Sequence, residues 1–114
     1  MKTSSAKNKG RKLQATVRDR VLQCLPQLEP DDAKSTPMGS PGEDLQLSPA
    51  ARKLFPYSVE CKSRATMSIY EWYQQAQVNS PKGVEPLLVV KQDRSKELVV
   101  MSMEHFFSLQ EKLK

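Results

Sequence analysis

The sequence predicts a single small α/β domain in which a mixed central β-sheet is flanked by helices. Three observations lead to this fold class. The length of 114 residues suits one domain with one modest core. Three stretches repeat apolar residues every three or four positions, which is typical of helices that bury one face. Short apolar runs of strand length lie between these stretches, so helices and strands alternate along the chain.

The N-terminal stretch predicts a basic arm followed by a helix. Residues 1–7 show no apolar pattern, and we expect them to form a flexible arm ahead of a domain that spans residues 8–114. From Asn8 the pattern becomes helical, and Pro26 is expected to end the helix because the residue before a proline is pushed out of the α region. An apolar residue recurs at every fourth position of this helix: Leu13, Val17, Val21 and Leu25.

Local sequence signals place the remaining elements. Clustered proline and glycine indicate a loop, Ser48-Pro49 is typical of a helix start, and Ser68-x-x-Glu71 is a capping box. The first half of the chain is expected to form a loop over 29–42 with a short strand near 33–36, a strand over 44–47 and a helix from 49 to 54. The second half is expected to form a strand over 57–62, a helix from 69 to 79, strands over 87–90 and 98–101 joined by a turn at 93–95, and a last helix after Ser102.

The charge distribution indicates a polyanionic partner. The formal net charge is +5, and residues 1–20 contain seven lysines and arginines against one aspartate. A basic segment that runs into a helix favours nucleic acid as the partner, whereas a solvated tail that aids solubility is the alternative. No apolar run approaches membrane length, so we expect no membrane contact. With two cysteines and no secretory signal, a reducing cytoplasm fits the chain.

Two acidic residues and one lysine form the candidate catalytic group. On a strand, Glu60 and Lys62 share one face, while Cys61 points to the other. Asp44 lies on the preceding strand and supplies a second carboxylate. Mg²⁺ prefers such hard oxygen ligands, and the backbone carbonyl of Cys61 is a candidate third oxygen. Lys62 would orient or help deprotonate an attacking water, or neutralise the leaving phosphate.

The Glu-x-Lys pattern has an alternative interpretation. The chain is 27% charged, so the pattern also arises by chance on a solvated strand face. A cross-strand charge pair of that kind contributes only about 0.2–1 kcal/mol to stability. The Gly/Pro-rich loop before Asp44 and the basic first helix favour the catalytic interpretation. His105 is the only histidine and is expected to be an ordinary helix residue.

Three segments in order resemble a known nuclease family. They are Lys9-Gly10, then Ser35-Thr36-x-x-Gly39-x-x-Gly42-Glu43-Asp44, then Glu60-Cys61-Lys62-Ser63. In this order they resemble the archaeal-type Holliday junction resolvases of the PD-(D/E)xK nuclease superfamily, and the small size is similar to that of a phage-encoded member. The resemblance implies a restriction-endonuclease-like fold, Mg²⁺ (or Mn²⁺) as cofactor, branched or double-stranded DNA as substrate, and the cytoplasm, or the host cytoplasm for a viral protein. It also implies a homodimer, because symmetric cleavage of a four-way junction needs two sites.

The resemblance also implies roles for individual residues. It implies that Asp44 and Glu60 bind the metal and that Lys62 is the catalytic lysine. It places Ser35 or Thr36 near the scissile phosphate. Comparison with the family also puts Gln14 and Gln75 near the metal or its water. The basic residues expected on DNA are Lys9, Arg11, Lys12, Arg52, Lys53 and Arg64, and for Arg52 and Lys53 the alternative is that they cover an end of the sheet. For Gln75 an exposed helix position without a role is the favoured alternative.

The chain departs from the family pattern at Gln14, where the family usually has a glutamate. A glutamine offers a neutral carbonyl oxygen that binds a cation less strongly than a carboxylate does. A nucleic-acid-binding module with a degenerate, non-catalytic site is therefore the second hypothesis. A small structural or adaptor protein with an incidental acidic strand face is the third.

Overall fold

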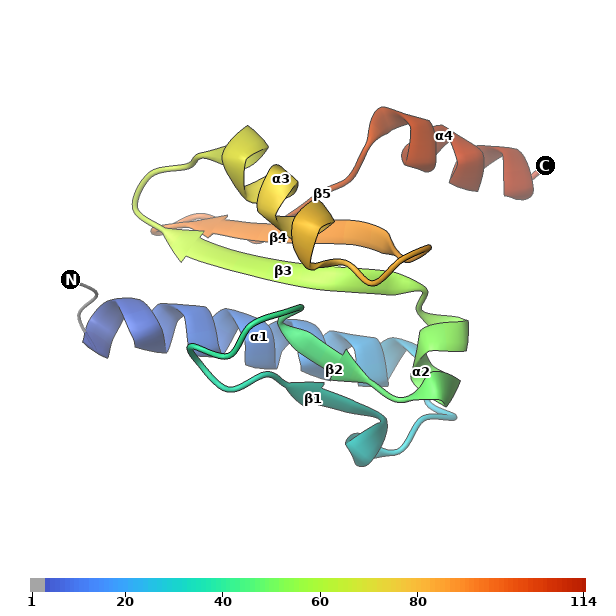
Figure 1. The fold of residues 1–114 in the computed structure, drawn as a ribbon, viewed down its shortest axis with the longest axis horizontal. Helices are drawn as coiled ribbons and strands as arrows, with labels where there is room; N and C mark the ends of the chain where they lie inside the picture. Colours follow the sequence, from blue (N-terminus) through green and yellow to red (C-terminus); the bar gives the residue numbers. More distant parts are fainter. Residues whose placement is uncertain (1–3) are drawn as a thin grey trace.

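The computed structural model describes residues 4–114, and its centre is a three-stranded mixed sheet (Figure 1). The strands are ordered β3 (Tyr57–Arg64), β4 (Glu85–Gln92) and β5 (Leu98–Val100). β3 runs parallel to β4, with Cys61 opposite Val89, and β5 runs antiparallel to β4, with Val99 opposite Val89. The predicted α/β class with a mixed sheet flanked by helices is confirmed, as is the turn between the last two strands.

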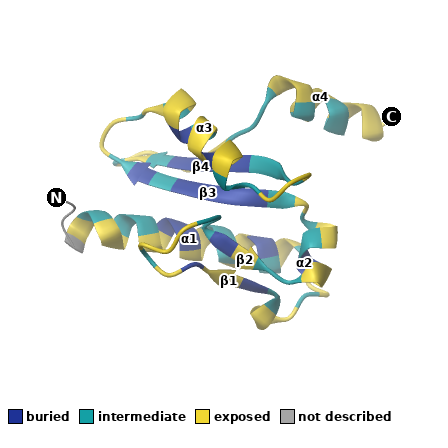
Figure 2. Ribbon diagram, viewed as in Figure 1, coloured by how far each residue is buried: buried dark blue, intermediate teal, exposed yellow. Residues whose placement is uncertain are grey.

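Helices α1 (Ser4–Cys24) and α3 (Ile69–Asn79) lie on opposite sides of this sheet (Figure 1). A parallel strand pair covered on both faces needs continuous apolar runs, and β4 provides one with four consecutive buried residues. Figure 2 shows these buried segments of β3 and β4 between the two helices. The core on the α1 side contains Leu13, Val21, Val59, Cys61, Leu87 and Val89, and the core on the α3 side contains Trp72, Leu88 and Val90.

Strands β1 (Ala33–Ser35) and β2 (Leu45–Leu47) form a separate antiparallel pair beside α1. They follow the short 3₁₀ turn η1 (Pro30–Asp32) and precede helix α2 (Pro49–Leu54). One backbone hydrogen bond connects this unit to the central sheet, because the Asp44 N–H donates to the Val59 carbonyl at 2.8 Å. After Asp44 the backbone pairs with β1 instead of β3, so the two predicted strands do not extend the central sheet.

Helix α4 (Met103–Lys112) projects from the sheet and carries the C-terminus (Figure 1). The Ser102 hydroxyl caps it by accepting a hydrogen bond from the His105 N–H at 3.0 Å, as the sequence predicts. His105 is more than an ordinary helix residue, because its Nε2 lies 2.7 Å from the Tyr57 hydroxyl and ties α4 to β3. The exposed apolar side chains of this C-terminal region are Met103, Phe106, Phe107 and Leu113.

Two local predictions need correction. The helix was expected from Asn8, but α1 begins at Ser4, so residues 4–7 of the expected flexible arm are helical; residues 1–3 of that arm lie outside the described residues. Ala6 and Lys7 favour helix, and no proline or glycine interrupts the first turn. The predicted capping hydrogen bond of the Ser68 side chain at the start of α3 is also absent from the structure, so this part of the prediction is wrong. The Ser68 backbone ψ of 66° lies outside the extended region that a capping side chain needs.

Candidate active site

A cavity of about 320 Å³ lies at the free edge of β3, where α1, α3 and the loop over residues 37–42 meet. Strand β3 contributes Glu60, Cys61 and Lys62 to its lining, and Asp44 faces them from the start of β2. The cavity therefore contains all three residues that the sequence predicts to be catalytic: Asp44, Glu60 and Lys62.

The Asp44 carboxylate is anchored to the backbone of β3. Its Oδ2 accepts a hydrogen bond of 2.7 Å from the Cys61 N–H. The N–H and the C=O of one residue in an extended strand point to the same side, so the Cys61 carbonyl lies on this edge as well. Val59 accepts the Asp44 N–H on the same edge, which aligns the two segments on both sides of the carboxylate.

Glu60 is 4% exposed, and it carries its carboxylate into the cavity between two polar partners. Its Oε2 lies 3.7 Å from the Lys62 Nζ, and its Oε1 accepts a hydrogen bond of 3.2 Å from the Asn79 side chain. Burial raises the pKa of Glu60, and the nearby charge of Asp44 raises it further, while Asn79 and Lys62 partly offset this rise. The group is therefore a buried carboxylate whose ionised form lacks full compensation from the protein.

Gln14 lies on α1 and lines the same cavity. The residue is 5% exposed, and its Oε1 has no hydrogen-bond partner. A buried carbonyl oxygen without a partner costs about 1–3 kcal/mol, so such an atom is uncommon unless a ligand completes it. Gln14 thus adds a neutral oxygen donor to the two carboxylates.

The oxygen donors of the cavity fit a hard divalent cation. Asp44 and Glu60 are acidic, the Gln14 Oε1 is unpartnered, and the Cys61 carbonyl lies on the Asp44 edge. Mg²⁺ and Mn²⁺ take oxygen ligands of these types and retain several waters. Within residues 4–114 no group of three His, Cys, Asp or Glu side chains could hold a metal, so a cation here would depend on the amide and backbone oxygens.

The Cys61 thiol has no place in this donor set. Cys61 is buried, and its side chain belongs to the apolar core on the α1 side. Burial raises the pKa of the thiol strongly, and the Asp44 and Glu60 charges add to that rise, so the thiol stays protonated. Only the backbone of Cys61 is available to the site, as the sequence analysis expected.

The structure does not bring the predicted loop residues to the site. Thr36 is buried, and its hydroxyl donates to the Glu43 carbonyl at 2.8 Å, so it connects β1 to the segment before β2. Ser35 is exposed at the end of β1, and neither residue lines the cavity. Both residues lie outside the cavity because this loop bends back into a strand pair, and their place near the scissile phosphate stays a prediction.

The short helix α2 lies outside the cavity lining, and DNA contacts by its two basic residues stay a prediction. Arg52 donates to the Tyr57 carbonyl at 2.6 Å and to Glu43 Oε2 at 2.7 Å, so its guanidinium holds α2 against the start of β3. Lys53 is exposed, but α2 contributes nothing to the lining of the cavity. Glu43, adjacent to Asp44 in sequence, does not line the cavity; its Oε2 binds Arg52, and its buried Oε1 has no hydrogen-bond partner.

The remaining basic residues divide between the cavity and its surroundings. Arg64 lines the cavity, and its guanidinium lies 5.8 Å from the Trp72 ring centroid. Lys9 forms an ion pair with Asp93 at 3.0 Å. Arg11 and Lys12 are exposed on α1 and lie outside the cavity lining. Gln75 is an exposed residue of α3, and it also lines the cavity. Its position therefore agrees with both interpretations, an exposed helix position and a position beside the site.

Asn79 and Lys7 are polar residues of the cavity that sequence reasoning missed. Asn79 is the last residue of the helix expected over 69–79, and its amide donates to Glu60. Its spacing of four residues from Gln75 places both on one face of α3 and is the signal that could have identified it. Lys7 was assigned to the flexible arm, but it lines the cavity. Gly10 lies three residues after Lys7 on α1, and Gln14 lies four residues after Gly10, so all three share one side of the helix.

Compared with protein-family models, curated proteins and solved structures, the chain has no significant match in any of the three. Within residues 4–114, no helix combines the length and the apolar character needed to cross a bilayer.

Proposed function

We propose that this protein is a Mg²⁺-dependent (or Mn²⁺-dependent) DNA endonuclease that acts on branched DNA, similar to the Holliday junction resolvases of the PD-(D/E)xK superfamily. One observation carries the proposal. Asp44, Glu60 and Lys62 converge on one cavity whose wall also contains an unpartnered buried oxygen, that of Gln14. Such a group of oxygens beside an ammonium suits phosphodiester hydrolysis, in which negative charge develops on the phosphate.

The charges of the cavity explain what each residue would do. Asp44 and Glu60 would hold the cation, with Gln14 and the Cys61 carbonyl as neutral donors. A bound divalent ion supplies a polarised phosphoryl oxygen and a water of lowered pKa. Lys62 lies 3.7 Å from Glu60, where its ammonium can orient the attacking water or neutralise the leaving phosphate oxygen. Asn79 holds the Glu60 carboxylate from the side of α3.

Branched DNA and a homodimer are the finer parts of the proposal. Lys7 and Arg64 line the cavity, and such cations favour a polyanion at this opening. Symmetric cleavage of a junction requires two sites, and exposed Phe106 and Phe107 on α4 provide an apolar surface for a second copy. Sedimentation of the wild type and of Phe107→Glu tests the dimer: we expect the variant to be monomeric, and a monomeric wild type would overturn this part.

Cleavage of a synthetic four-way junction with Mg²⁺ tests the activity. We expect the wild type to cleave, and Asp44→Asn and Glu60→Gln to lose cleavage while both retain DNA binding, since each substitution removes a negative charge. Glu71→Gln is the matched control, because Glu71 is exposed on α3 outside the cavity. Equal cleavage by the wild type and Asp44→Asn would overturn the metal site.

A non-catalytic DNA-binding module is the second candidate function. It is favoured by the substitution of a neutral glutamine for the expected carboxylate at position 14. DNA binding that weakens with salt, without cleavage in Mg²⁺ or Mn²⁺, would support this candidate. Failure to bind DNA at low salt would instead favour a structural or adaptor role.

A further inference from the structure

A second polar recess lies between the first turns of α1 and the β4–β5 turn. It has a volume of about 350 Å³ and is lined by Lys9, Ser63, Lys91, Asp93 and Arg94. Three of these side chains are cationic and one is anionic, so the recess carries a formal charge of +2 (three positive charges and one negative). An excess of positive charge in a concave polar surface favours an anionic ligand.

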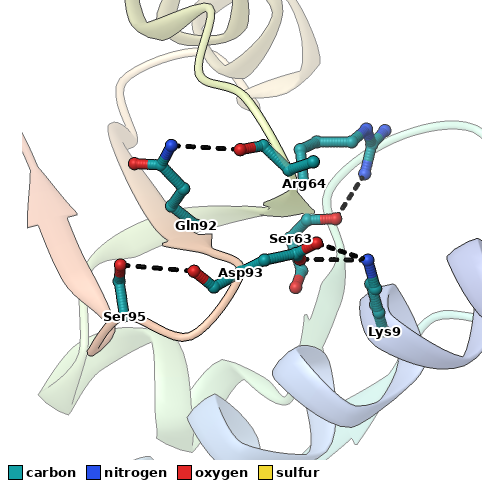
Figure 3. Close-up of polar contacts among 7 residues, drawn as sticks. Lys9, Ser63, Arg64, Gln92, Asp93 and Ser95 are labelled. Carbon is teal, nitrogen blue, oxygen red and sulfur yellow. Dashed lines mark hydrogen bonds and ion pairs between the residues drawn. The ribbon is translucent and has the colours of Figure 1, made fainter.

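The recess is built by an ion pair that connects distant parts of the chain. The Lys9 Nζ lies 3.0 Å from each Asp93 carboxylate oxygen, which joins α1 to the turn (Figure 3). The turn is also tied to β3, because the Asp93 N–H donates to the Arg64 carbonyl at 3.0 Å and the Gln92 amide donates to the Ala65 carbonyl at 3.0 Å. The positions of Lys91 and Arg94 relative to α1 are therefore held by several contacts.

Arg94 adopts a backbone conformation that does not suit its side chain. Its φ is 62°, the only positive φ of a non-glycine residue within residues 4–114. It is the third residue of a turn closed by the hydrogen bond from the Ser95 N–H to the Gln92 carbonyl at 3.0 Å. Turns with positive φ at this position ordinarily carry glycine or asparagine, because a Cβ is strained there. An arginine in this position lowers the stability of the folded protein, and it places a cation at the recess.

The recess and the cavity of the candidate active site adjoin one another. On α1, Lys9 of the recess is followed by Gly10 of the cavity. On β3, Ser63 of the recess lies between Lys62 and Arg64 of the cavity. Neighbouring residues are about 1.5 Å apart along a helix axis and about 3.3 Å apart along a strand, so the same backbone segments of α1 and β3 contribute to both linings.

We propose that this recess is a second phosphate-binding site, which holds the backbone of the DNA strand that enters the candidate active site. The inference rests on the proposed function for the identity of the ligand. A duplex carries one negative charge per about 1.7 Å of axis, so DNA with one phosphate in the cavity has further phosphates beside it. Arg94 and Lys91 contact the phosphate, and Asp93 holds Lys9 at the rim while it lowers the affinity by its own charge.

Two substitutions move affinity in opposite directions and test the inference. Binding of a DNA duplex and of a four-way junction is measured by fluorescence anisotropy in EDTA over a range of salt concentrations. We expect Arg94→Gly to weaken binding about 3-fold to 10-fold and to reduce the slope of log K against log salt by about 1, as loss of one phosphate contact does. The same variant should unfold at an equal or higher temperature than the wild type, because glycine relieves the positive φ.

Asp93→Asn is the second variant, and we expect it to bind DNA more tightly than the wild type. Arg20→Gln is the matched control, since Arg20 is an exposed arginine on α1 about 16 Å of helix axis from Lys9. Wild-type affinity and salt slope in Arg94→Gly would overturn the inference. The inference would also be overturned if Arg94→Gly lost binding of inorganic phosphate but kept its DNA binding, because the recess would then be a site for a free anion.

The outcomes also separate this inference from the proposed nuclease. If Arg94→Gly weakens DNA binding while the wild type fails to cleave in Mg²⁺ or Mn²⁺, the second phosphate site stands and the nuclease falls. If the wild type cleaves and Arg94→Gly binds DNA normally, the nuclease stands and the second site falls. Absence of DNA binding by the wild type at low salt would overturn both.

Discussion

The Asp44 carboxylate accepts a 2.7 Å hydrogen bond from the Cys61 N–H, and this contact fixes the two acidic segments of the cavity relative to each other. Within residues 4–114, one backbone hydrogen bond joins the same segments, from the Asp44 N–H to the Val59 carbonyl. A side chain that both aligns a strand edge and faces the cavity is held in place before any ligand binds. Asp44 thus contributes to the preorganisation that a cation site requires.

Removal of the Asp44 charge should abolish stabilisation by Mg²⁺. Asp44→Asn retains an oxygen that can accept the Cys61 N–H but loses the anionic ligand. For the wild type, Mg²⁺ at about 100 times its Kd stabilises the fold by about 2.7 kcal/mol. For a domain of this size that corresponds to a rise in Tm of about 10 °C or more. Calorimetry with and without Mg²⁺ measures this rise, which we expect to be absent in Asp44→Asn and present in Glu71→Gln; an equal rise in all three proteins would contradict the prediction.

The raised pKa of Glu60 predicts a pH-dependent stability in the absence of metal. Above its ordinary value of 4.5 and up to its raised folded pKa, Glu60 is protonated in the native state and ionised in the unfolded state. The native state therefore binds more protons, and the free energy of unfolding falls as pH rises through this window. Glu60→Gln lacks the titrating group, so wild-type stability should fall relative to that of the variant.

Urea unfolding of both proteins from about pH 4 to about pH 8 in EDTA measures this difference. Mg²⁺ should reverse the loss in the wild type, because a cation compensates the ionised carboxylate. A stability difference between the two proteins that is constant with pH would show that Glu60 titrates normally.

Two substitutions of Gln14 should change the free energy of unfolding and the affinity for Mg²⁺. Gln14→Leu removes the unpartnered buried oxygen, and we expect it to raise the free energy of unfolding by about 1 kcal/mol and to weaken Mg²⁺ binding. Gln14→Glu restores an anionic ligand and should lower the Mg²⁺ concentration at half-maximal cleavage. Denaturant unfolding and a Mg²⁺ titration measure the two effects. If neither variant changes the titration, Gln14 is not a ligand.

The parts of the fold that local periodicity determines could be predicted from the sequence. The period of two along β3 correctly placed Glu60 and Lys62 on one side and Cys61 in the core. Prolines and the Ser102 cap correctly located the ends of helices. Arg52 and Thr36 could not be assigned in this way, because their side chains are occupied by Glu43 and by backbone carbonyls that approach only in the folded chain.

The amide of Asn79 should tune the pH dependence of cleavage through Glu60. Its hydrogen bond to Glu60 Oε1 favours the ionised carboxylate and lowers the pKa against the effects of burial and Asp44. In Asn79→Ala the pKa of Glu60 rises further, so the acidic limb of the pH–rate profile should move to higher pH. Metal affinity should fall about tenfold to a hundredfold at neutral pH, as is usual when a partner of a metal ligand is lost.

A structural role for Asn79 at the end of α3 would produce a different result. It would lower stability and reduce cleavage equally at every pH, without moving the acidic limb. Gln77→Ala is the matched control, because Gln77 lies on the same helical turn but outside the cavity. Cleavage rates of the three proteins across pH at one fixed, subsaturating Mg²⁺ concentration separate the two roles. A limb that stays at the wild-type position in Asn79→Ala would show that the hydrogen bond does not control the ionisation of Glu60.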